Sequence, residues 1–148
     1  MKFVLKSFNE LTLTELYDML KLRCAVFVIE QNCNYQDMDD KDQMSYHLIG
    51  FDNDNKLSAC ARILPKGISY PEVSIGRVMV DKKIRGTGAG KELMKLAIEY
   101  AVKLYKAEEI VISAQCYLDK FYSDLGFVAE GESYLDDDIP HIKMRLKL

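Results

Sequence analysis

An apolar strand, a glycine-rich turn and an amphipathic helix follow one another between residues 73 and 104. The strand-type run ends in Val-Met-Val at residue 80, and three glycines then alternate with other residues at Gly86, Gly88 and Gly90. Glycine lets a backbone approach a ligand closely, and the first turn of a helix leaves N–H groups unpaired at the positive end of its dipole. We therefore expect a phosphate-binding turn, with Arg85 and Lys91 at its two sides.

Two common phosphate motifs do not fit this turn. A nucleotide P-loop needs a serine or threonine directly after Gly-Lys, but Glu92 follows Gly90-Lys91, and no earlier glycine stands at the required spacing. A dinucleotide fingerprint needs Gly-x-Gly-x-x-Gly near the start of a parallel sheet, whereas these glycines alternate deep in the chain. Taken alone, the turn can also be an ordinary structural one.

Composition excludes several classes of protein. The 148 residues are 49% hydrophobic and 29% charged, which predicts a single domain over residues 1–148. A net charge of -3 argues against nucleic-acid binding, and no apolar run reaches membrane-spanning length. Without a signal-peptide pattern, we expect a cytoplasmic protein. The four cysteines form no Cys-x-x-Cys pair and only two histidines accompany them, so we expect reduced cysteines and no metal.

Periodicity predicts alternating strands and helices. A capping box at Thr12-x-x-Glu15 begins one helix, and Gly126 ends another. The expected strands are residues 3–8, 46–51, 57–64, 73–80, 109–114, a strand restarting at 127–128, and 142–148; the expected helices are residues 13–28, 88–104 and 118–125. The first strands follow one another closely and should pair, and the later strands alternate with helices. This order predicts an α/β fold, a mixed sheet with helices on both faces.

The segment 31–44 breaks this periodicity and is rich in acidic residues. It contains two asparagines, four aspartates and Tyr35 as its main aromatic residue. One interpretation is a solvated acidic connection, and the other is a group of carboxylates that attracts a cationic substrate into a cleft. Spacing alone favours the first.

A second motif lies after the glycine turn. Phe121-Tyr122-x-x-Leu125-Gly126-Phe127 follows Arg85-x-x-Gly88-x-Gly90 at the expected distance, and together they resemble the two hallmark segments of the GNAT superfamily of N-acetyltransferases. The resemblance extends over most of the chain and is to the ElaA-like branch. The segments that carry it include Arg23-x-x-Val26-Phe27-Val28-x-Glu30-Gln31, Tyr35-Gln36-Asp37-x-Asp39-x-x-Asp42, Ser69-Tyr70-Pro71 and Ile139-Pro140-His141.

This resemblance implies a GNAT fold with acetyl-CoA as cofactor. Two central strands would splay after residue 78, so that a free edge pairs with the pantetheine arm. The residues implied in cofactor binding are Val78, Met79, Val80, Arg85, Gly86, Thr87, Gly88, Ala89, Gly90, Lys91, Gln115 and Tyr122. Dimers are common in this superfamily, so a homodimer is a possible assembly.

The implied reaction is direct attack of an amine on the thioester. A phenol can protonate the departing thiolate at neutral pH, and Tyr122 is our candidate general acid. Glu72, Glu30 and His47 are the candidates for the general base, and the residues alone do not decide among them. The acceptor, an amine of a small molecule or a protein, would meet Tyr35, Asp37, Asp39, Arg62, Arg77 and His141.

Two alternatives remain open at this point. The segment 23–42 is also similar to acyl-homoserine-lactone synthases, although this chain is short and has no tryptophan. A catalytically silent acyl-CoA-binding module would keep the glycine turn and lose turnover.

The chain also departs from the ElaA-like pattern, because Cys116 and Tyr117 stand where alanine and histidine are expected, and Ala25 stands where an acidic residue is common.

Overall fold

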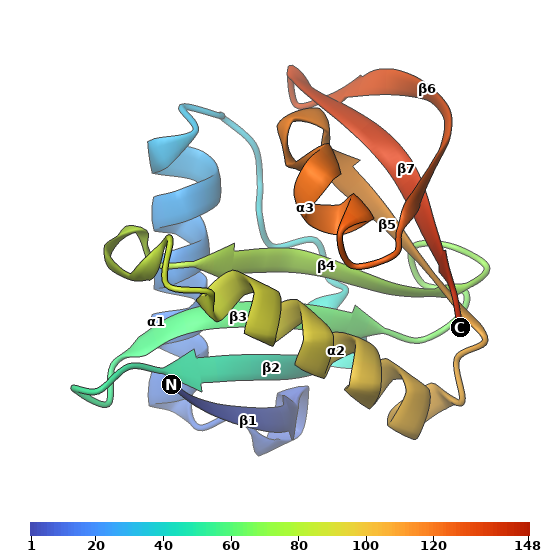
Figure 1. Ribbon diagram of the computed structural model, residues 1–148. Helices are drawn as coiled ribbons and strands as arrows, with labels where there is room; N and C mark the ends of the chain where they lie inside the picture. The colour runs from blue at the N-terminus through green and yellow to red at the C-terminus, as the bar shows by residue number, and fades with distance from the viewer.

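Seven strands form one mixed sheet in the order β1-β2-β3-β4-β5-β7-β6 in the computed structural model, which describes residues 1–148 (Figure 1). All neighbours are antiparallel except β4 and β5, which are parallel. The strands are β1 (Lys2–Ser7), β2 (Tyr46–Phe51), β3 (Leu57–Leu64), β4 (Val73–Val80), β5 (Glu109–Gln115), β6 (Val128–Asp136) and β7 (Ile139–Lys147). The predicted mixed α/β sheet is confirmed.

Helices cover both faces of the sheet. In Figure 1, α2 (Ala89–Tyr105) crosses in front of β2, β3 and β4, and α1 (Leu13–Arg23) runs behind them. The predicted capping box at the start of α1 is present, because the Glu15 N–H donates to Thr12 Oγ1 and the Thr12 N–H donates to Glu15 Oε1. The remaining helical segments are α3 (Asp119–Ser123) and the 3-10 turns η1 (Phe8–Glu10), η3 (Asp42–Met44), η4 (Lys82–Ile84) and η5 (Cys116–Leu118).

The first helix differs from its prediction. Instead of one α-helix over residues 13–28, α1 ends at Arg23 and the chain continues as a π-helix, η2 (Cys24–Glu30). Three β-branched residues, Val26, Val28 and Ile29, fall in this segment, and such side chains crowd the turns of a regular α-helix. Wide π-turns are frequent next to functional sites. Here the segment ends beside the cavity described below.

Two apolar layers hold the sheet between its helices. Leu93, Met94 and Ala97 of α2 are fully buried against strand residues such as Ile63 and Ile110. On the opposite face, Met19, Leu22 and Val26 pack on Ile49, Cys60 and Met79. The apolar stripe predicted for the second helix is therefore its sheet-facing side.

The sheet splits in its middle. β4 and β5 are paired only at Val73 with Ile110 and at Ser74 with Val111, and beyond these positions the two strands diverge (Figure 1). The prediction placed the split after residue 78, which is four residues too late. β5 pairs along its whole length with β7 and turns away with it, whereas β4 stays paired with β3.

The other predicted elements agree to within a few residues, except that β6 is longer than the two residues predicted at 127–128. β6 is an exposed edge strand of mostly polar residues, which carry little apolar periodicity. The four cysteines are free. None of the helices is both long and apolar enough to cross a membrane.

Candidate active site

A cavity of about 810 Å³ occupies the split between β4 and β5. Its wall is built from η2, the segment after it, β4, the end of β5, α3 and the turn between β6 and β7. The predicted cofactor residues Val78, Met79, Val80, Arg85, Gly90, Gln115 and Tyr122 all line it. So do the predicted acceptor residues Tyr35, Asp39, Arg62, Arg77 and His141. The split therefore brings most of both predicted sets to one cavity.

One wall of the cavity is a free strand edge. From Ile75 to Val80, β4 has a partner on the β3 side only. A bulge interrupts that pairing between Cys60 and Arg62, and Arg77 within it has a positive φ of 49°. Unpaired backbone groups on such an edge can hydrogen-bond an extended molecule that carries amides.

The glycine turn connects this edge to α2. Gly86 and Gly88 have φ values of 80° and 88°, which glycine adopts without strain, and a side chain at either position would meet only open space. Gly88 is the N-cap of α2, so no side chain caps the first N–H groups of this helix. The turn thus presents unpaired donors at a helix N-terminus, as a phosphate site requires.

Not every residue of the predicted turn reaches the main cavity. Gly88 and Lys91 line a separate shallow depression over the exposed side of α2, together with Lys95. Gly86, Thr87 and Ala89 line neither hollow. The Thr87 hydroxyl instead donates to the Ile84 carbonyl at 2.6 Å and closes the turn.

Arg85 is held by an ion pair across the cavity mouth. Its guanidinium donates to both carboxylate oxygens of Glu30, with Nη2 at 2.7 Å from Oε2. The hydrogen bond from Arg85 lowers the pKa of Glu30, which makes this carboxylate a poorer base. Glu30 was one of the candidate general bases, and in the structure it is the ion-pair partner of Arg85.

Tyr122 lies in the apolar part of the cavity wall. Its ring makes edge-to-face contacts with Phe121 and Phe127, at centroid distances of 5.0 and 5.9 Å. The side chain is buried, and burial raises the pKa of Tyr122 to about 12. No protein group hydrogen-bonds to its hydroxyl, so this hydroxyl is a free proton donor that stays protonated at neutral pH.

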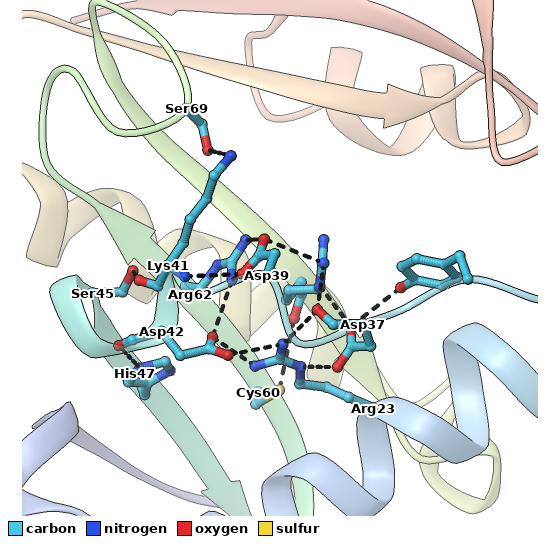
Figure 2. A network of polar contacts seen from close by, with 12 residues as sticks. Arg23, Asp37, Asp39, Lys41, Asp42, Ser45, His47, Cys60, Arg62 and Ser69 are labelled. Carbon is cyan, nitrogen blue, oxygen red and sulfur yellow. Dashed lines mark hydrogen bonds and ion pairs between the residues drawn. The ribbon is translucent and has the colours of Figure 1, made fainter.

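Three arginines and three aspartates form a network that reaches from the cavity wall, at Arg62, Arg77 and Asp39, into the interior; Figure 2 shows most of it. Arg23 lies between Asp37 and Asp42, with Nε at 2.7 Å from one carboxylate and Nη1 at 2.8 Å from the other. Arg62 donates to Asp39 at 2.7 and 2.8 Å and to Asp42 at 3.0 Å. Arg77 donates to Asp37 at 2.7 Å. The six formal charges cancel.

This network corrects both interpretations of the acidic segment. Burial alone would raise the pKa of Asp39 and of Asp42, but the hydrogen bonds and charges of Arg62 and Arg23 hold both pKa values below their usual range. Both carboxylates are paired with arginines, so they form neither a solvated connection nor a free charge that attracts a cation. Asp37 was predicted to bind the acceptor, but it does not line the cavity and instead binds Arg23, Arg77 and the Tyr35 hydroxyl.

Two of the predicted bases lie outside the cavity. Glu72 accepts a hydrogen bond from Arg145 at 2.7 Å, and Arg145 also contacts Glu109 and Glu130. His47 is buried, and its Nε2 lies 2.9 Å from the Asp42 carbonyl oxygen, to which it donates. Neither residue lines the cavity and each is held by another group, so neither is placed to take a proton directly from an amine there.

Sequence reasoning did not single out Gln31, which bridges the cavity. Its side-chain amide exchanges hydrogen bonds with that of Gln115, at 3.2 and 3.4 Å. Gln31 follows η2 and Gln115 ends β5, so the pair joins the two sides of the split. The only signal in the sequence was its position at the end of the segment 23–31 that carries the family resemblance.

The buried histidine predicts a pH dependence of stability. Burial lowers the pKa of His47 below the value of about 6.5 expected in the unfolded chain, so the unfolded state binds more protons in that window. The free energy of unfolding should therefore be highest above about pH 6.5. It should fall by on the order of 1 kcal/mol between about pH 6.5 and pH 5. Urea unfolding at pH 5 and pH 8 measures this. A His47→Gln variant should lose most of that difference, and an unchanged difference would contradict the assignment.

Comparison with known proteins identifies relatives along almost the whole chain. A family model described as an acetyltransferase (GNAT) domain matches residues 14–148. The protein ElaA of Escherichia coli (strain K12) is 42% identical over 138 residues, which cover 92% of this chain and 90% of that protein. A UPF0039 protein of Synechocystis is 42% identical over 137 residues, which cover 93% of this chain and 89% of that protein.

Solved structures give the same result. The crystal structure of an acyl-CoA N-acyltransferase from Pseudomonas aeruginosa matches with a TM-score of 0.91 and 40% identity, covering 99% of both chains. The structure of E. coli ElaA matches with a TM-score of 0.91 and 38% identity, again over 99% of both chains. The CoA-dependent acyl-homoserine lactone synthase BjaI has a TM-score of 0.77 at 15% identity, covering 97% of this chain and 81% of that one. The likeness to BjaI concerns the fold alone.

Proposed function

Because the chain belongs to the GNAT family of acetyltransferases and is similar to ElaA, we propose that it transfers an acetyl group from acetyl-CoA to an amine. The observation that carries this proposal is the cavity in the split sheet, which joins a free strand edge, an uncapped helix N-terminus and a buried tyrosine hydroxyl. The first two suit the amides and the pyrophosphate of an acyl-CoA, and the third suits its sulfur.

The donor substrate fits the residues present. The edge of β4 at Val78, Met79 and Val80 would hold the pantetheine amides, and the turn from Arg85 to Lys91 would hold the pyrophosphate. Acetyl-CoA supplies an acetyl group already activated as a thioester. Arg85 would exchange the Glu30 carboxylate for a phosphate oxygen, since both are anions at the same mouth of the cavity.

The chain's own groups would provide the remaining chemistry. An amine that attacks the thioester carbon forms a bond there while the carbon–sulfur bond breaks, and the leaving thiolate needs a proton. Tyr122 would donate it, because its hydroxyl has no other partner and its pKa of about 12 keeps it protonated. No enzyme nucleophile is needed for this direct transfer.

The acceptor would enter the part of the wall that contains Tyr35, Arg77 and His141. The Asp39 carboxylate in that part is already paired with Arg62 and Arg77, so a general attraction of cations is not its role. We therefore expect recognition by shape and by individual hydrogen bonds. No specific observation supports the alternative of an acyl-homoserine-lactone synthase, because the similarity to those synthases concerns the fold alone.

Two measurements test the proposal. Titration calorimetry should show binding of acetyl-CoA and of CoA, and release of free thiol should follow when a panel of small amines and lysine peptides is added. Absence of heat with both ligands would refute the proposal. Binding without thiol release from any acceptor would favour the silent acyl-CoA-binding module.

The ion pair at the cavity mouth gives a matched pair of variants. Arg85→Gln should weaken acetyl-CoA binding by about 10-fold, because it removes a charge-assisted contact to the pyrophosphate. Glu30→Gln should leave the affinity unchanged or increase it a few-fold, because the competing carboxylate is gone. Calorimetric Kd values decide this. If Glu30→Gln instead lowers kcat strongly at unchanged Kd, Glu30 regains its predicted role as a base.

A further inference from the structure

We propose that His141 is the general base that takes the proton from the attacking amine. This inference deepens the proposed function and rests on it. Three observations support it: the position of the side chain, the hydrogen bond that selects its tautomer, and the pairing of Glu30 and Asp39 with arginines.

His141 stands on β7 beside the end of β5. Its register partner is Gln115, the last residue of β5 and one of the two residues that bridge the cavity. Side chains of directly opposed residues project from the same side of a sheet. Both residues line the cavity, as does Tyr122. The imidazole thus borders the same space as the proposed general acid.

One hydrogen bond selects the tautomer of this ring. Nδ1 lies 2.7 Å from the Ile139 carbonyl oxygen, and a carbonyl only accepts, so Nδ1 carries the hydrogen of the neutral ring. Nε2 then has the lone pair. No protein group bonds to Nε2, and it is not among the buried side-chain atoms that lack a partner, so it is open to a substrate. After protonation at Nε2, the Nδ1 contact becomes charge-assisted and stronger.

Aromatic and acidic side chains surround the ring. Tyr134 of β6 is stacked on it, with centroids 6.2 Å apart and an interplanar angle of 21°. Asp136, the last residue of β6, and Asp137, in the turn that follows it, also line the cavity and form no ion pair. Cys33, from the segment after η2, contacts the backbone of that turn through the Asp137 carbonyl. No cation pairs with these groups.

The other candidates are occupied or misplaced. Glu30 is paired with Arg85, Asp39 is paired with two arginines, and Glu72 and His47 do not line the cavity. Asp136 and Asp137 line the cavity without an ion-pair partner, but a carboxylate is ordinarily a weaker base than an imidazole. His141 is the histidine of the cavity wall, and histidine is the side chain most often used as a general base.

The proton balance of the step is complete. His141 Nε2 takes one proton from the ammonium of the acceptor, and the freed amine nitrogen forms a bond to the thioester carbon. The carbon–sulfur bond breaks, and its electron pair leaves on sulfur, which takes the Tyr122 proton. A second proton from nitrogen restores the Tyr122 hydroxyl. The third stays on the amide, and His141 releases its proton to water.

Nitrogen-15 spectroscopy of the imidazole rings tests the geometry without any turnover. The chain has only two histidines, and a His47→Gln variant assigns their signals. For the neutral ring of His141 we expect a protonated Nδ1 and an unprotonated Nε2, the minor form of free histidine. The opposite tautomer would overturn the proposal.

Kinetics test the role. With ethylamine as acceptor, His141→Gln should lower kcat/KM about 100- to 10,000-fold at pH 7 and move its rise with pH to more alkaline values. With trifluoroethylamine, whose fluorines keep it uncharged at this pH, the loss should shrink to within about 10-fold. Lys147→Gln is the control, because Lys147 is exposed at the other end of β7. This variant should change neither kcat/KM nor its dependence on pH.

The outcomes separate the two proposals. If the wild-type protein transfers acetyl to either amine and His141→Gln keeps the same rate and pH profile, the base assignment is wrong and the function stands. An equal loss with both amines would make His141 a binding residue. If the wild-type protein acetylates neither these amines nor any member of the panel, the function fails, and the nitrogen-15 spectrum still decides the tautomer.

Discussion

Replacing Tyr122 by phenylalanine is expected to lower kcat by about 100- to 10,000-fold, the range found when a positioned general acid is lost. The affinity for acetyl-CoA and the free energy of unfolding should stay close to those of the wild-type protein. The ring keeps its contacts with Phe121 and Phe127, and the hydroxyl leaves no partner unsatisfied because it has none in the protein. Thiol-release kinetics, calorimetry and urea unfolding measure the three quantities.

A control variant removes a hydroxyl elsewhere. Tyr105 of α2 packs edge-to-face on Tyr46, and neither residue lines the cavity. Tyr105→Phe should therefore change kcat by less than about threefold. If Tyr122→Phe keeps kcat within tenfold of wild type, the proton for the thiolate comes from another source and Tyr122 has a packing role only.

The elements that sequence reasoning located well are those specified by local signals. The hairpin strands β2 and β3 and the central strand β4 have the predicted limits, and the capping box at Thr12 begins α1 as expected. Each depends on residues close together in the chain. The π-turn after Arg23 and the point where β4 and β5 separate depend on partners in other strands and helices, so the sequence alone could not place them.

The same distinction applies to the site. The glycine turn and Tyr122 belong to contiguous motifs, and their approximate place in the fold followed from these motifs. The surroundings of the candidate bases did not follow from sequence motifs, because the groups around each side chain come from distant parts of the chain. Glu30 meets Arg85 across 55 positions, and Glu72 meets Arg145 across 73. Only the tertiary structure shows that these carboxylates are already paired.

The acidic segment shows how misleading a run of charges can be. Spacing alone favoured a solvated connection for the segment that contains Asp37, Asp39 and Asp42, because most runs of charge are solvated. The arginines that neutralise them come from α1, β3 and β4. Removing one partner from a buried network of this kind leaves an uncompensated charge, which strongly destabilises a folded chain.

Asp42→Asn is expected to destabilise the protein by about 3–5 kcal/mol, because it leaves a buried arginine charge without its partner. Asp42 accepts hydrogen bonds from both Arg23 and Arg62, and all three side chains are at least nine-tenths buried. Its pKa is held below the unfolded value, so this contribution is present above about pH 4 and is lost as the pH falls through the lower folded-state pKa. Urea unfolding at pH 7 and at about pH 2.5, below the unfolded-state pKa, measures both effects.

Asp40→Asn is the matched control, since Asp40 is an exposed neighbour of the same type in the same segment and forms no ion pair. It should change the free energy of unfolding by less than about 0.5 kcal/mol. The difference between the wild type and Asp42→Asn should narrow at acid pH, because the wild-type carboxylate is then partly protonated as well. Equal stabilities for the two variants at pH 7 would mean that the carboxylates are solvated after all, and the network would then not be what holds the segment 37–42 against the sheet.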